Sequence, residues 1–375
     1  MLKSLINSFR CPKCKIQPSN FFVVPFRETE ERVIDGLLKC LECQNSYVIS
    51  DTLLELVIPE LSDRDALSDF QSRYASQLDC DGGYSASELN SKTIEALAPQ
   101  YEQRNHFDWY ASPEGQTYTE YQDSSFWRSV DLATFERLEE KHLPQECQIV
   151  DIGCADGRSA FQLLGEKRTV VGFDVSHKML RRAVERSRSM KVDNRISFFV
   201  GDGDQIPFQD ESQRFICTYG VLHHLPNANQ ACKEIYRVLK SGGVYIGSEN
   251  NDSAFRGVFD FLMQISPLWT ELAGEEPLIS RPKLEEWFGG LSYKMESYTS
   301  VYLPPHIFNL FDTNTAKKLL MLSDKWISRF PYMKTQGGLI VYMLTKTGEP
   351  IAITTIDAEA MCTEIESKSP VVAAR

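Results

Sequence analysis

The chain has 375 residues, enough for one large and one small domain or for two medium domains. Its composition, 42% hydrophobic and 25% charged, is typical of a soluble globular protein. Its net charge of −12 argues against a nucleic-acid binder, because phosphate neutralisation requires clustered Lys and Arg. No apolar run reaches the ~18 residues of a membrane span. The first residues are also too polar for a signal peptide, so we expect a cytoplasmic protein.

Residues 1–60 contain two Cys-x-x-Cys pairs, "CPKC" and "CLEC", separated by twenty-five residues. Four thiolates, from Cys11, Cys14, Cys40 and Cys43, suit tetrahedral zinc, and each pair can form its turn locally across a long intervening loop. We therefore expect residues 1–60 to form a zinc-ribbon module that needs a structural metal to fold. Two unrelated pairs of surface cysteines and an iron–sulfur centre are the alternatives.

Residues 61–125 are polar and mixed in character. They begin with a helical pattern, pass through a Gly-Gly loop and then become rich in aromatic and turn residues, including "WY" at 109–110. We interpret this stretch as a linker and cap segment.

A regular alternation of strands and helices begins near residue 126. The predicted strands span 147–153, 169–175, 195–202, 214–221 and 243–249, and the predicted helices span 130–143, 159–164, 177–187 and 229–239. Such alternation predicts a parallel sheet covered by helices on both faces. The predicted elements after an insertion at 251–292 are a strand at 293–303, a helix near 314–328 and a strand at 338–346. Residues 349–375 lack a core pattern, so we expect a disordered tail.

The stretch "QIVDIGCADGRSAFQLL" (148–164) is a strand, a glycine turn and a helix, the outline of a nucleotide site. A phosphate-binding P-loop is excluded by the spacing of Gly153 and Gly157 and by Arg158 in place of the Lys. A dinucleotide fingerprint fails at Ala155 and again at Arg158. The pattern that remains is Asp-x-Gly-x-x-x-Gly, in which the Asp151 carboxylate can accept from an ammonium, as in the amino-acid part of S-adenosylmethionine.

Two further carboxylates follow the next two strands. Asp174 ends "VVGFDV" and is placed to accept from both ribose hydroxyls, although dinucleotide sites share this feature. Asp202 ends "FFVGD" and is placed to accept from an adenine amino group. Three such residues after three successive strands predict an adenosine-containing ligand at the carboxyl edge of the sheet.

Residues 126–250 resemble the class I S-adenosylmethionine-dependent methyltransferases of the type 11 family. The motifs "VDIGCADG", "VVGFDVSHKMLRRA", "GDGDQIPF", "TYGVLHHL" and "EIYRVLKSGG" match that family in order. The resemblance implies a Rossmann-like, seven-stranded, mostly parallel sheet, here preceded by the small zinc ribbon. The domain would span 126–348. The chain departs from the family pattern at Ala155, usually Gly, at Gln213 and Arg214, usually Phe-Asp, and at Ser241, usually Pro.

The resemblance also implies roles for particular residues in binding the methyl donor. The methionine end would be held from Asp151 to Gly157, and the ribose, the adenine and the sulfonium by residues after the next strands. The implied residues are Asp151, Gly153, Cys154, Ala155 and Gly157 for methionine, Asp174 and Val175 for ribose, Asp202 and Gly203 for adenine, and Tyr219 near the sulfonium.

Methyl transfer needs a base only if the nucleophile keeps its proton. His223 and His224 are the first candidates and Glu249 is a weaker one, with a structural role favoured over a catalytic role for the histidines. The stretch "TYGVLHHL" lacks the Asn/Asp-Pro-Pro-aromatic signature of enzymes that methylate base amines. We therefore expect a small or lipid-like acceptor from a biosynthetic pathway, methylated at O, C or N and capped by 251–292.

Two other functions stay open. Residues 40–57 resemble the zinc ribbons that accompany RNA methyltransferases, so a ribosomal or transfer RNA methyltransferase could contact RNA through the ribbon and the basic helix at 177–191. The second alternative is a non-catalytic scaffold with a methyltransferase fold, which would use the ribbon to bind a protein partner.

Overall fold

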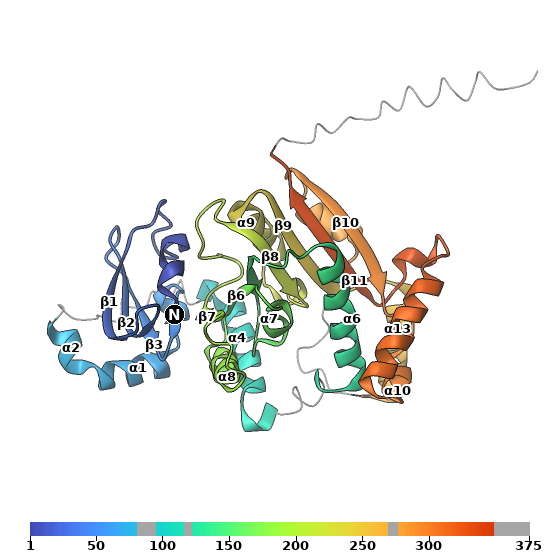
Figure 1. The fold of residues 1–375 in the computed structure, drawn as a ribbon, viewed down its shortest axis with the longest axis horizontal. Helices are drawn as coiled ribbons and strands as arrows, with labels where there is room; N and C mark the ends of the chain where they lie inside the picture. Colours follow the sequence, from blue (N-terminus) through green and yellow to red (C-terminus); the bar gives the residue numbers. More distant parts are fainter. Residues whose placement is uncertain (81–94, 116–121, 269–276, 349–375) are drawn as a thin grey trace, which may run out of the picture.

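The computed structural model describes residues 1–80, 95–115, 122–268 and 277–348. Within them, eleven strands form one sheet in the order β1-β2-β3-β4-β7-β6-β5-β8-β9-β11-β10. The first strands lie at one end of the molecule and α13 lies at the other (Figure 1). The predicted tail at 349–375 and part of the predicted cap insertion, 269–276, lie outside the described residues.

The predicted alternation of strands and helices is present after residue 147. Its elements are β5 (Gln148–Ile152), α7 (Arg158–Leu163), β6 (Thr169–Asp174), α8 (His177–Ser189), β7 (Ile196–Val200), β8 (Gln213–Tyr219), α9 (Ala228–Val238) and β9 (Leu239–Asn250). The β7-β6-β5-β8-β9 block is parallel throughout. One expectation here is wrong, because β9 begins at Leu239 and not at 243. A register shift between Gln213 and Phe215 of β8 lets the ladder continue past residues 241–243 of β9.

The remaining predicted elements complete this part of the sheet. They are α6 (Ser125–Lys141), β10 (Tyr293–Ser300), α13 (Thr313–Ile327) and β11 (Leu339–Lys346), and β11 lies antiparallel between β9 and β10. Shorter elements in the C-terminal half are η4 (Leu222–His224), α10 (Ala254–Ile265), α11 (Arg281–Trp287), α12 (Pro305–Phe308) and η5 (Met333–Thr335).

The N-terminal residues join the same sheet. They form η1 (Lys3–Ser8), β1 (Phe21–Glu28), β2 (Val33–Cys40), β3 (Ser46–Ser50) and β4 (Leu53–Glu55). β1 to β4 pair in antiparallel order, and β4 then pairs in parallel with β7, Leu54 opposite Phe199 and Glu55 opposite Val200. Our prediction of a seven-stranded, mostly parallel sheet is therefore wrong. The sheet has eleven strands, and five of its ten pairings are antiparallel.

Helices cover both faces of the central sheet, as the alternation predicted. Along β5, Ile149 packs with α6, α7 and α8 on one face, whereas Val150 packs with α9 and α11 on the other. Phe9 of residues 1–60, the N-terminal unit, also packs on the second face. Its ring centre lies 5.2 Å from that of Phe199 on β7. Residues 1–60 and the central sheet thus share one hydrophobic core.

The segment between these parts is helical where it is described. It contains η2 (Pro59–Leu61), α1 (Arg64–Arg73), α2 (Ala75–Cys80), α4 (Ala98–Tyr110) and η3 (Pro113–Gly115). Helix α4 packs against α8, and its Asp108 accepts a hydrogen bond from Ser176, the N-cap residue of α8 (2.6 Å). Among the described residues, no helix is both long and apolar enough to cross a bilayer.

Candidate cofactor site and cysteine cluster

A pocket lies where β5, β6, β7 and β8 reach their carboxyl ends. Eight of the ten residues proposed to bind the methyl donor line it: Gly153, Cys154, Ala155, Asp174, Val175, Asp202, Gly203 and Tyr219. The pocket contains about 760 Å³ of non-atom space, part of it open to solvent. Asp151 and Gly157 do not line it. Asp151 is fully buried behind the wall, and Gly157 is the N-cap residue of α7.

The glycine turn keeps the backbone close to the pocket. Gly153 has φ +68°, and a Cβ at this position would lie 2.6 Å from Cγ1 of Val221 on the opposite loop. A larger residue would therefore push the two walls apart. Ala155, where the family pattern has Gly, also adopts positive φ (46°).

Asp151 has one satisfied and one unsatisfied oxygen. Ser159, which lines the pocket, donates to Oδ2 (2.6 Å), whereas Oδ1 is buried without a hydrogen-bond partner among the described residues. Burial raises the pKa of Asp151 to about 7, because the charged form loses its hydration. A cationic group at this oxygen would favour the charged form.

The carboxylates of Asp174 and Asp202 stand at the pocket wall and organise its backbone. Asp174 accepts from the amides of Ala155 and Ser176, both at 2.9 Å, and Asp202 accepts from the amide of Asp204 at 2.9 Å. Burial raises the pKa of each to about 6. Each carboxylate has further lone pairs, so both can still accept from ligand hydroxyl or amino groups.

Tyr219 belongs to a polar cluster at the edge of the pocket. Its hydroxyl donates to Asp131 (2.8 Å), and Asp131 holds the pocket residue Arg158 in a bidentate pair, both contacts 2.7 Å. The Arg158 guanidinium also lies 5.3 Å from the ring of Trp127. These contacts fix Arg158 at the pocket edge. In the sequence, the same residue argued against a P-loop and against a dinucleotide fingerprint.

Helix α4, within the predicted linker and cap segment at 61–125, forms a wall of the pocket with residues that the sequence did not identify. Gln103 and Phe107, one helical turn apart, line it, and Gln103 donates to the carbonyl of His224 (2.6 Å). The Phe107 ring meets the His224 ring edge to face at 5.3 Å. We expected a cap from "WY" at 109–110 and from 251–292, but no described residue of either stretch lines the pocket. The four-residue spacing of Gln103 and Phe107 indicates one face of a helix, but nothing in the sequence places that face at the pocket.

The three candidate bases occupy different positions. His224 lines the pocket, whereas His223 and Glu249 lie behind its wall. Glu249 accepts from the amide of Leu222 (2.8 Å), and its other oxygen lies 2.5 Å from Nδ1 of His223. This arrangement orients the loop after β8. A catalytic role for any of the three stays a prediction.

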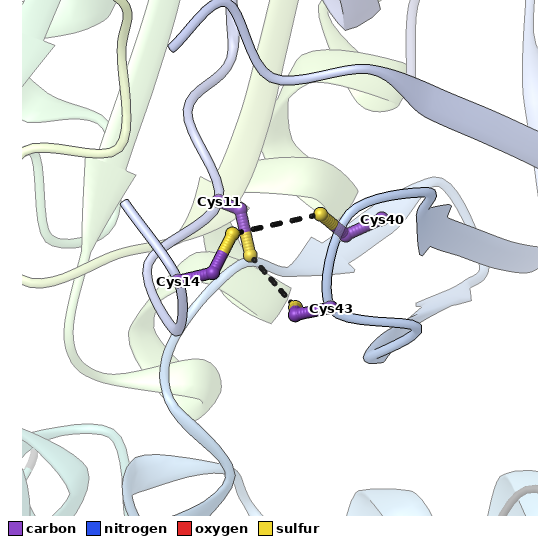
Figure 2. A group of neighbouring side chains, drawn as sticks. All are labelled: Cys11, Cys14, Cys40 and Cys43. Atoms are coloured by element: carbon purple, nitrogen blue, oxygen red, sulfur yellow. Dashed lines mark hydrogen bonds between the residues drawn. The ribbon is translucent and has the colours of Figure 1, made fainter. Parts of the chain in front are cut away.

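The four N-terminal cysteines converge on one point (Figure 2). Their sulfurs all lie within 4.8 Å of one another, with Cys11 to Cys43 at 3.7 Å and Cys14 to Cys40 at 3.8 Å. A disulfide would need about 2.05 Å. Four sulfurs bound at about 2.3 Å to a tetrahedral zinc would instead lie about 3.8 Å apart, so this geometry fits the predicted metal.

The two cysteine pairs have the same local backbone. Lys15 donates from its amide to the carbonyl of Cys11, and Gln44 does so to Cys40, both at 2.9 Å. Both donors have positive φ, 57° and 60°. Each turn is closed within five residues, as expected if the pairs form locally.

The basic helix α8 is engaged inside the protein. Arg188 and Arg181 contact Asp51 of the N-terminal unit, at 2.8 and 3.4 Å, and Arg182 donates to the carbonyl of Ala111 (2.7 Å). His177, the first residue of α8, pairs with the buried Glu55 of β4. These side chains join three parts of the fold.

Comparison with known proteins gives the class of the central domain. Residues 150–247 match the model of the family described as "Methyltransferase domain". The chain is 31% identical over 97 residues to 27-O-demethylrifamycin SV methyltransferase of Amycolatopsis mediterranei, covering 26% of the chain and 36% of the relative. It is 30% identical over 119 residues to demethylmenaquinone methyltransferase of Lactiplantibacillus plantarum, covering 31% and 48%. The chain thus spans less than half the length of the curated relatives that it matches.

A solved structure is also similar. Phosphoethanolamine N-methyltransferase 2 of Haemonchus contortus, in complex with S-adenosyl-L-methionine, aligns with 19% identity and a TM-score of 0.42, over 65% of this chain and 60% of that one. The family match confirms the predicted resemblance to methyltransferases for residues 150–247, the stretch that supplies most of the pocket.

Proposed function

We propose that this protein is an S-adenosylmethionine-dependent methyltransferase that acts on a small-molecule or lipid-like acceptor. One observation carries the proposal: the stretch that matches the methyltransferase family also supplies the glycine turn and the buried carboxylates of one pocket. The open lone pairs of Asp174 and Asp202, which line the pocket, fit a ligand with hydroxyl groups and an amino group, and the charge of Asp151 behind the wall favours an ammonium in the same ligand.

The protein's part in the reaction is binding, orientation and exclusion of water. When bound, S-adenosylmethionine supplies a methyl group on an already activated sulfur leaving group, so transfer is an in-line displacement. Asp174 and Asp202 would hold the nucleoside part, and Phe107 and Leu225 would keep water from the reacting centre. The imidazole of His224 faces the pocket and could accept an acceptor proton.

The proposed acceptor class rests on the relatives and on the charge distribution. The two named relatives are methyltransferases of rifamycin and menaquinone compounds. RNA methylation is not favoured, because the arginines of α8 are engaged internally and the chain carries net charge −12. We also propose that Cys11, Cys14, Cys40 and Cys43 hold a structural zinc ion.

Calorimetric titration with S-adenosylmethionine tests the donor, and labelled methyl transfer into lipid, RNA and small-molecule fractions of a cell extract tests the acceptor. We expect Asp174→Ala to weaken donor binding at least tenfold, since the variant loses one ligand contact and two backbone contacts. Label in the RNA fraction would support the RNA alternative. No donor binding, or binding unchanged in Asp174→Ala, would support the scaffold alternative.

A further inference from the structure

Exposed apolar side chains gather in one region of this protein. Ten of the fifteen exposed large hydrophobic residues in the described chain lie within 258–332. The most regularly spaced of these residues lie on α13 and the turn after it. Helix α13 is at the end of the molecule opposite β1 and β2 (Figure 1). Leu322, Trp326 and Phe330 follow one another at spacings of four residues and are 54%, 55% and 65% exposed. We call these three residues the apolar strip.

A row of cations lies beside the apolar strip. Lys318, Lys325 and Arg329 are exposed and are spaced seven and four residues apart, so they point in one direction from the helix. We call them the basic strip. The two strips are neighbours, since the Arg329 guanidinium lies 4.2 Å from the ring centre of Trp326. The opposite face of α13 is buried, with Ala316 and Leu320 in the core beside α6.

The local charge is opposite to that of the whole protein. Residues 313–338 contain five Lys or Arg and one carboxylate, Asp324, whereas the chain carries net charge −12. Asp324 is buried and pairs with Arg137 at 2.8 Å, so it does not neutralise the exposed cations. Tyr332, 73% exposed, and the exposed Lys334 extend the same composition past the helix.

Neighbouring strips of aromatic and basic side chains are suited to bind the surface of an anionic bilayer. Trp, Phe and Tyr rings insert at the level of the head groups, while Lys and Arg attract anionic lipids. A protein partner would instead have to receive these rings in matching pockets. The high exposed fractions mean that the rings project outward, and a bilayer accepts projecting side chains without a complementary shape.

We propose that α13 and the turn up to Tyr332 dock this protein on the surface of an anionic lipid bilayer. The basic strip draws the acidic protein to the membrane in one orientation, and the apolar strip enters the head-group region. This proposal does not rest on the proposed methyl transfer, because it uses none of the pocket residues.

The experiment is co-sedimentation of the full chain with vesicles of phosphatidylcholine alone or with added phosphatidylglycerol. One variant is Leu322→Ser with Trp326→Ser and Phe330→Ser, and a second is Lys318→Gln with Lys325→Gln and Arg329→Gln. The matched control is Phe22→Ser with Leu41→Ser, which removes similarly exposed side chains (58% and 51%) from the N-terminal unit. Melting temperatures check that each variant folds. Trp326→Ser alone replaces the apolar triple variant, and Lys325→Gln alone replaces the basic one, if either does not fold.

We expect the wild type and the control to bind only the anionic vesicles, with binding that weakens as salt is added. Each cation removed should weaken binding about fivefold, from about 1 kcal/mol per charge. The apolar variant should also lose most of its binding. Wild-type protein that does not bind anionic vesicles would overturn the proposal. So would equal binding by the control and the strip variants, or self-association through the apolar strip without vesicle binding.

Discussion

The carboxylate of Glu249 at the end of β9 lies 2.5 Å from Nδ1 of His223, in the loop after β8. The same carboxylate accepts from the amides of Val221 (3.2 Å) and Leu222 (2.8 Å). Val221 lines the cofactor pocket, whereas Glu249 and His223 do not. Glu249 and His223 therefore influence the pocket indirectly, because Glu249 holds the backbone of Val221 in place.

We expect Glu249→Ala to lower the free energy of unfolding by about 3 kcal/mol, because it leaves two buried amides and a buried imidazole without their acceptor. Donor affinity should fall with it, since Val221 loses its anchor. Glu249→Gln, which keeps one acceptor oxygen, should lose less of both. Urea unfolding and calorimetry measure the two effects. Turnover that disappears while stability and donor affinity stay unchanged would instead make Glu249 a catalytic group.

The raised pKa values of the buried carboxyls predict a pH dependence. Burial raises the pKa of Asp151 to about 7 and those of Asp174 and Asp202 to about 6, so all three become charged as the pH rises from 5 to about 8. A ligand with an ammonium and hydroxyl donors binds the charged forms, so donor affinity should rise over this range. Asp151→Asn should flatten the upper part of the rise, whereas Asp69→Asn, an exposed carboxyl on α1, should not.

The same groups act on stability with the opposite sign. Between the ordinary pKa of 3.8 and about 7, the folded ligand-free protein holds more protons at Asp151 than the unfolded chain does. Its stability should therefore fall as the pH rises through this range, by up to about 4 kcal/mol from Asp151. Asp151→Asn should remove most of the fall between pH 6 and 7 in urea unfolding, whereas much of the fall below pH 6, to which Asp174 and Asp202 also contribute, should remain. An unchanged fall between pH 6 and 7 in the variant would show that other groups cause it.

Removal of the metal should destabilise more than the N-terminal unit, since residues 1–60 share a core with the central sheet. We expect one zinc ion per chain by mass spectrometry, and a loss of roughly 3 kcal/mol or more when a chelator or Cys43→Ser removes it. Cys147→Ser, a free thiol outside the cluster, is the control. Purified protein without zinc would contradict the assignment.

Ala155 has a backbone conformation that costs a residue with a Cβ about 1–2 kcal/mol. Ala155→Gly should therefore leave the free energy of unfolding unchanged or raise it by up to about 1 kcal/mol, because relief of strain offsets the freer unfolded chain. Ala183→Gly within α8 should instead cost about 1 kcal/mol. Thermal unfolding of both variants gives the comparison, and a clear loss from Ala155→Gly would show that the methyl group packs usefully.

The sequence predicted those parts of the fold that depend on local patterns. The strands and helices from 148 to 250 followed from periodicity and turn residues. The pairing of Leu54 with Phe199 could not be predicted in this way, because it joins segments far apart in the chain. The stretch "LLELV", apolar except for Glu55, is nevertheless typical of a buried strand. Pairing partners over such distances are not encoded in a local pattern.

The candidate site was predictable to the same extent. Its floor consists of residues that follow strands, and a topological rule places such residues together. Gln103 and Phe107 come from a helix outside the alternating pattern, and no rule of spacing brings that helix to the pocket. The cysteine cluster was fully predictable, since each pair forms its own turn and four thiols suit one ion.

The parallel pairing of β4 with β7 has a practical consequence. If residues 1–60 were removed, β7 would become an outer strand with unpaired backbone amides and carbonyls at Phe199 and Val200. Open edges of this kind recruit strands from other molecules, so the isolated central domain should aggregate. Expression of this protein for structural or enzymatic work should therefore include residues 1–60, which supply β4.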